Sequence, residues 1–73
     1  MSIFRQLTAI TEREDSGFVS LCPELDIASQ GETVETARAN LEEAIQLFFE
    51  TASTQKIAQR LKTEVYITNL SLA

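Results

Sequence analysis

The sequence predicts an α+β fold in which one main helix packs on one face of a small antiparallel sheet, with the elements in the order β-β-β-α-β. Three observations lead to this prediction. Short β-branched and aromatic runs separated by polar turns come first, a strongly amphipathic stretch follows, and a second alternating run closes the chain. The 73 residues suffice for a single domain, 1–73, built around one core.

The first part of the chain predicts a three-stranded antiparallel meander. Residues 1–13 form the first expected strand, and a polar turn joins it to a second strand over residues 17–22. Pro23 ends the second strand, because it lacks an N–H and restricts the backbone of the residue before it. Residues 27–30 give a brief third strand, which is closed by Gly31.

One amphipathic helix is expected after the third strand. Thr33 is its expected N-cap, because a threonine hydroxyl can accept a hydrogen bond from an N–H of the first turn. Apolar residues then recur at helical spacing and form one stripe that faces the sheet. The stripe consists of Val34, Ala37, Leu41, Ala44, Ile45, Phe48 and Ala52. Leu47 and Phe49 widen the apolar surface, which indicates a second covered side or contact with another subunit.

The C-terminal part of the chain contains one segment whose structure is undecided and one predicted strand. Residues 54–62 are compatible with either a short second helix or a loop. Residues 63–73 are expected to form a final strand, whose alternate side chains point to opposite sides. Both sides are apolar: one carries Val65 and Ile67, the other Tyr66, Thr68, Leu70 and Leu72. This strand is therefore expected to be covered twice or to pair at an interface.

Composition limits the possible partners and locations. The net charge is −5, from 11 acidic and 6 basic residues, so the chain lacks the basic surface that nucleic-acid binding needs. No signal peptide and no membrane-spanning stretch are predicted, and the single cysteine fits a reducing compartment, so the cytoplasm is expected. Because so small a core is marginally stable, we expect a homodimer or tetramer. Its interface is expected to contain Phe49, Tyr66, Leu70 and Leu72.

The residue types present argue against catalysis. The chain has no histidine, which excludes Ser-His-Asp and Cys-His pairs and histidine-based zinc sites, and it has no glycine-rich phosphate loop. Cys22 is expected to be a packed, unreactive thiol. We therefore predict no enzyme activity, no cofactor and no metal. Turn carboxylates such as Asp15 and Asp26 leave a metal-dependent nuclease as a poor alternative, since solvated acids are common at turns.

The stretch from residue 17 to residue 50 resembles the HicB-like antitoxin family of small bacterial and archaeal proteins. The order and spacing of several short elements carry the resemblance, and they cover about half of the chain. The elements are Gly17-Phe18, Pro23-Glu24-Leu25, Ser29-Gln30-Gly31, Glu32-Thr33, Ala37, Asn40 and Glu43-Ala44. The sequence departs from the family pattern at Asp26-Ile27 and at Thr36. The Asn40 amide is expected either to bond a neighbouring loop or strand end, or to be exposed.

The resemblance implies a truncated ribonuclease-H-like fold without catalysis. It also implies a role in neutralising a small basic RNA-cleaving toxin, HicA-like, by masking its active surface, together with self-association. Many relatives carry a further C-terminal DNA-binding segment. Here the chain ends at Ala73, so direct DNA binding is not expected.

Two functional hypotheses follow from these observations. In the first, the domain is a HicB-type antitoxin module that binds a basic toxin through its turn acids. The candidate contacts are Glu12, Glu14, Asp15, Glu24 and Asp26. In the second, it is an orphan domain that self-associates without a toxin partner, or that binds a small ligand.

Overall fold

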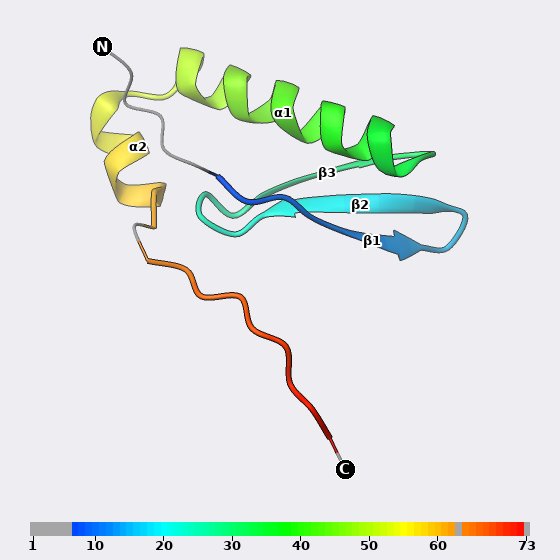
Figure 1. The fold of residues 1–73 in the computed structure, drawn as a ribbon. Coiled ribbons are helices and arrows are strands. Elements are labelled where there is room, and N and C mark those ends of the chain that lie inside the picture. The colour runs from blue at the N-terminus through cyan, green and yellow to red at the C-terminus, as the bar shows by residue number, and fades with distance from the viewer. Residues whose placement is uncertain (1–6, 63, 73) are drawn as a thin grey trace.

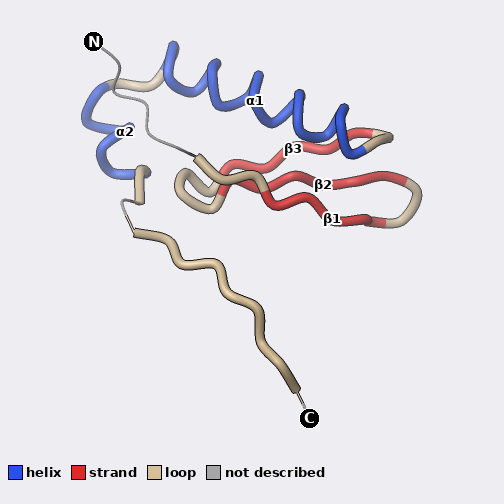
Figure 2. Tube along the Cα trace, in the orientation of Figure 1, coloured by secondary structure: helices blue, strands red, loops and turns tan. Residues whose placement is uncertain are grey.

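The computed structural model describes residues 7–62 and 64–72, and it confirms the α+β class (Figure 1). Three antiparallel strands are followed by a long helix and a short helix (Figure 2). These elements are β1 (Ile10–Glu14), β2 (Gly17–Cys22), β3 (Ile27–Gly31), α1 (Val34–Thr51) and α2 (Thr54–Arg60). The predicted first strand, residues 1–13, is thus confirmed over residues 10–13 and wrong over residues 7–9, which are in no strand, while residues 1–6 lie outside the described residues.

The register of the sheet assigns its side chains to two faces. The strand order is β1-β2-β3, and Ser20 of β2 lies opposite both Thr11 and Ser29. The hydroxyls of Thr11 and Ser20 are 2.9 Å apart, so these neighbours share a face, as cross-strand partners must. Ser20 and Cys22 are fully buried, which makes theirs the face under α1. Figure 1 shows α1 lying over this side of the sheet.

The opposite face carries no helix among the described elements, and we call it the open face (Figure 1). By register it is formed by the other set of alternating residues. They are Ile10, Glu12, Glu14, Val19, Leu21, Ala28 and Gln30. Ile10, Leu21 and Ala28 form a continuous apolar row across the three strands, and Ile10 is 38% exposed.

The core lies between α1 and the end of the sheet formed by the β2–β3 turn. Its fully buried centre is Cys22 and Leu25, together with Leu41 of α1. Partly buried apolar side chains surround this centre: Leu7, Ile27, Ile45, Phe48, Phe49 and Leu61. Leu25 is therefore a turn residue that acts as a core residue, a role that strand and helix periodicity does not reveal.

The start of α1 agrees with the sequence analysis. The Thr33 hydroxyl accepts a hydrogen bond from the Thr36 N–H at 3.0 Å, as an N-cap does. At Gly31 a Cβ atom would lie 2.6 Å from the backbone nitrogen of Ala37, so a side chain does not fit there. Helix and sheet thus make close contact at Ala37, one turn into the helix. Val34 precedes this contact and is 44% exposed, so its predicted place on the buried stripe is wrong.

Residues 54–62, left open by the sequence, contain the helix α2. The Ser53 hydroxyl caps it by accepting a hydrogen bond from Lys56 N–H at 3.1 Å. The Arg60 guanidinium holds the helix against the β2–β3 turn: it donates to the carbonyl of Leu25 at 3.0 and 3.2 Å and to that of Asp26 at 3.1 Å.

The predicted strand over residues 63–73 is absent from the described part of that segment, residues 64–72. These residues run away from the sheet (Figure 1), and Tyr66, Leu70 and Leu72 are 80%, 87% and 92% exposed. Alternating apolar side chains predict extended backbone, but a strand also needs hydrogen bonds to a neighbouring strand, and residues 64–72 pair with none of the described strands. Residues 63 and 73 lie outside the described residues.

We expect Leu25→Ala to lower the free energy of unfolding by about 3 kcal/mol, because it leaves a cavity in the fully buried core. Leu47→Ala is the matched control. Leu47 is 59% exposed, so the same substitution there should change stability by less than about 0.5 kcal/mol. Urea unfolding followed by circular dichroism measures both changes, and equal losses would contradict the assigned core.

Candidate functional site

The five acids predicted to contact a partner lie in two groups at opposite ends of the sheet (Figure 1). Glu12, Glu14 and Asp15 lie on β1 and in the β1–β2 turn, and all three are exposed. Glu24 and Asp26 lie in the β2–β3 turn at the other end. The structure therefore brings together three of the five, and their role in binding stays a prediction.

The β1–β2 end gathers more negative charge than the sequence analysis assigned to it. Glu32, which follows β3, lines the same hollow as Glu14 and Asp15. We call Glu12, Glu14, Asp15 and Glu32 the acidic end. Asp15 has a φ of 53°, a left-handed conformation that aspartate tolerates better than most residues. Asp15 and Glu32 are 17 residues apart in the sequence, so the sequence pattern did not predict that they lie close together. The pairing of β1 with β2 and of β2 with β3 brings them to the same end of the sheet.

Arg13 lies between Glu12 and Glu14 in the sequence, but its side chain is on the opposite face of the sheet from theirs. Its guanidinium carbon is 4.6 Å from the centroid of the Phe18 ring, a cation–π contact on the α1 side of the sheet. Glu12 and Glu14 project from the open face, because alternate strand residues point to opposite sides. The carboxylates of the acidic end are therefore presented to solvent with this cation turned away from them.

Glu24 has a structural role that the sequence analysis did not predict. Its carboxylate accepts hydrogen bonds from the Thr8 N–H at 3.0 Å, the Thr8 hydroxyl at 2.5 Å and the Cys22 thiol at 3.3 Å. Partial burial acts to raise the pKa of Glu24, but the hydrogen bonds from Thr8 outweigh it and hold the pKa below its ordinary value. Glu24 thus ties the chain before β1 to the β2–β3 turn.

Cys22 is the packed thiol that the sequence predicts. It is fully buried in the core beside Leu25 and Leu41. Burial raises the pKa of its thiol, and the hydrogen bond to the Glu24 carboxylate raises it further. Since the thiolate is the reactive form, these surroundings make Cys22 a poor nucleophile.

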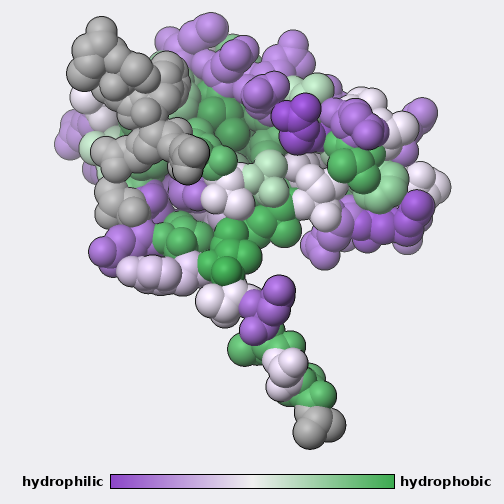
Figure 3. Space-filling view, viewed as in Figure 1, coloured by the Kyte–Doolittle hydropathy of each residue, from purple (hydrophilic) through white to green (hydrophobic). Residues whose placement is uncertain are grey.

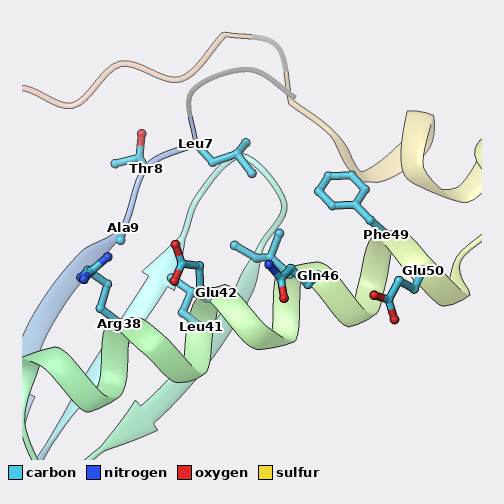
Figure 4. A pocket seen from close by; sticks show the side chains of 10 residues that line it. Leu7, Thr8, Ala9, Arg38, Leu41, Glu42, Gln46, Phe49 and Glu50 are labelled. Carbon is cyan, nitrogen blue, oxygen red and sulfur yellow. The ribbon is translucent and has the colours of Figure 1, made fainter. Parts of the chain in front are cut away.

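A groove beside α1 was not predicted from the sequence (Figure 4). It runs between one side of the helix and residues 7–9, the segment that leads into β1. Leu7, Ile45 and Phe49 supply apolar surface, and polar side chains one helical turn apart border it. These border residues are Arg38, Glu42, Gln46 and Glu50. The groove exists because α1 lies mainly over β3 and β2, a placement that helix periodicity alone does not fix.

The four predicted interface residues do not form one surface in a single chain. Phe49 is half-buried and lines the groove on α1. Tyr66, Leu70 and Leu72 lie on the extended segment, away from that helix (Figure 1). Figure 3 shows this segment as alternating apolar and polar residues that project from the body.

Residues 7–62 and 64–72 contain no group of three or more Asp, Glu, Cys or His side chains placed to hold a metal ion. Within the same residues, neither helix has the length and apolar character needed to cross a membrane.

We expect Glu24→Gln to lower the free energy of unfolding at pH 7 by about 1 kcal/mol, because the charged acceptor is lost. The pKa of Glu24 is lowered from 4.5 in the folded chain, so its stabilisation is present above that pH and fades as the pH falls. The difference between variant and wild type should therefore shrink at pH 3. Urea unfolding at both pH values measures it, and a pH-independent difference would show that the carboxylate charge contributes nothing.

The chain has a relative among known proteins. The chain is 49% identical over 47 residues to a UPF0150 protein of Synechocystis sp.. The matched part covers 62% of this chain and 65% of that protein, so the chain spans less than two thirds of its relative's length. No protein-family model matches the chain, and no solved structure matches it. The chain is therefore a homologue of a UPF0150 protein over most of its own length.

Proposed function

We propose that this chain is a non-catalytic protein-binding module of the HicB type, which neutralises a small basic RNA-cleaving toxin by covering its active surface. The proposal is supported by the resemblance of residues 17–50 to HicB-like antitoxins. The net charge of −5 is of the sign that a basic partner needs.

The observation that carries the proposal is the acidic end. Glu14, Asp15 and Glu32 come from the β1–β2 turn region and the β3–α1 connection, and they border one hollow. All three are exposed, so binding would not require the chain to open. A row of carboxylates held on a sheet end increases the rate of encounter with a basic surface and favours one orientation.

The chemistry of an RNA-cleaving enzyme explains why such a surface would inhibit it. An enzyme that binds RNA must present basic side chains to the phosphates. Carboxylates placed on those side chains compete with the phosphates for the same charges. Masking of this kind needs no catalytic group in the inhibitor, in agreement with the absence of histidine from the sequence.

The alternative is an orphan domain that self-associates without a toxin. The apolar side chains of residues 64–72 favour it, because Tyr66, Leu70 and Leu72 are largely exposed. The two functions use different surfaces, so separate variants can distinguish them.

The proposed binding is tested by pull-down and titration calorimetry at low and moderate salt, with a small basic protein from a neighbouring reading frame as the probe. We expect Glu12→Lys/Glu14→Lys to weaken the complex at least about tenfold, because two attractive charges become repulsive. Glu43→Lys/Glu50→Lys is the matched control, since it makes the same charge change on exposed positions of α1 and should weaken binding less. Wild-type affinity should fall as salt rises.

Two results would count against this proposal. If no complex forms at either salt concentration, the chain does not bind that protein. If both double variants weaken binding equally, the affinity depends on the net charge of the chain, and the acidic end is not the contact surface.

A further inference from the structure

We propose that residues 64–72 of one copy add as a strand to the open edge of β1 in a second copy, so that two chains exchange these segments in a symmetric dimer. We call residues 64–72 the arm. The inference does not depend on the basic partner, because it concerns the backbone edge of β1 and the apolar side chains of the arm, whereas the acidic end would bind through its carboxylates. It follows from the state of the two sheet edges, the two surfaces beside β1, and the sequence of the arm.

Of the two edges of the sheet, the β3 edge is contacted by α1 at its Gln30–Gly31 end. The Asn40 side chain of α1 donates a hydrogen bond from Nδ2 to the carbonyl of Gln30 at 2.8 Å, which confirms one of the two roles considered for this amide. The backbone of α1 also comes so close to Gly31 that no Cβ atom fits between them. An incoming strand would have to displace these contacts.

The β1 edge is open. Within the described residues β1 pairs with β2 alone, and four of its five residues are exposed. In an edge strand, alternate residues direct their N–H and C=O groups away from the sheet. Those groups are available to a further strand, and such edges readily accept one.

Apolar surface lies on both sides of a strand added at this edge. On the α1 side is the groove between the helix and residues 7–9 (Figure 4), whose lining includes the half-buried side chains of Ile45 and Phe49. On the other side is the open face, where the apolar row formed with Leu21 and Ala28 ends at Ile10, beside the edge. An added strand would therefore need apolar side chains on both of its sides.

The arm has this pattern. Val65 and Ile67 alternate with Tyr66, Leu70 and Leu72, so each side of an extended arm carries apolar side chains. The described arm is in no helix and no strand, and most of its side chains are exposed. Its one charged residue is Glu64, at its start, so the arm brings little repulsion to the acids of β1. Its nine residues are enough to cover the five of β1.

The point at which the arm leaves the body favours a second copy as the receiver. The Lys62 N–H donates to the carbonyl of Glu24 at 2.8 Å, and Arg60 holds α2 to the same turn. From there the arm runs away from its own sheet (Figure 1). It can therefore reach a neighbour without breaking any of these contacts. In a two-fold dimer each chain gives one arm and receives one, which leaves no open β1 edge.

The test uses the full chain. Light scattering over a dilution series should show a dimer that dissociates on dilution. Amide hydrogen exchange should show protection of the arm and of alternate β1 amides, and this protection should be lost together with the dimer. We expect Leu70→Glu to raise the dimer dissociation constant at least about tenfold, because it places a charge in a buried position of the added strand. Leu47→Glu makes the same change on an exposed part of α1 and should leave the constant unchanged.

Each other outcome overturns the inference. A chain that stays monomeric at all concentrations excludes the dimer. A dimer whose arm amides exchange as fast as those of an unstructured chain assembles through another surface. Protection of the arm that persists in the diluted monomer places the arm on its own sheet. Binding of a basic protein at the acidic end is measured separately, by the lysine variants, and a failure there would leave the dimer measurements unchanged.

Discussion

The placement of α1 over β3 and β2 is the constraint on which the rest of the structure depends. Leu41 packs against Cys22 and Leu25, and the missing side chain at Gly31 lets the helix backbone approach the sheet closely. Because the helix is held toward β3, it leaves the β1 side uncovered. The groove and the open β1 edge both result from this one off-centre contact.

The β2–β3 turn connects the beginning and the end of the described chain to this core. Leu25 fills the core, while the Glu24 carboxylate holds Thr8 and the Glu24 carbonyl accepts from Lys62 N–H. The carbonyl of Leu25 receives the Arg60 guanidinium. The four residues of the β2–β3 turn, 23–26, thus hold both the segment before β1 and the residues from which the arm extends. A small core is strengthened here by hydrogen bonds to buried or half-buried groups, which are worth most where water is excluded.

The sequence predicted the secondary-structure elements better than it predicted the contacts between distant parts of the chain. Period-two and helical patterns, Pro23 and Thr33 located β2, β3 and α1, because these signals act within a few residues along the chain. The long-range contacts were missed. Glu24 appears as a solvated turn acid in the sequence, and only its hydrogen bonds to Thr8 show otherwise. The arm has the pattern of a strand, but a pattern does not tell which edge, or which chain, a strand joins.

The charges of β1 restrict what can join its edge. Glu12 and Glu14 lie on the same face, so two β1 strands paired antiparallel would bring like charges close together, which is unfavourable. A strand that places only uncharged residues opposite Glu12 and Glu14 avoids that repulsion. Between Val65 and Leu72 the arm carries no charged residue. The same carboxylates that give the domain its acidic end therefore disfavour β1-to-β1 association and leave the edge to a neutral segment.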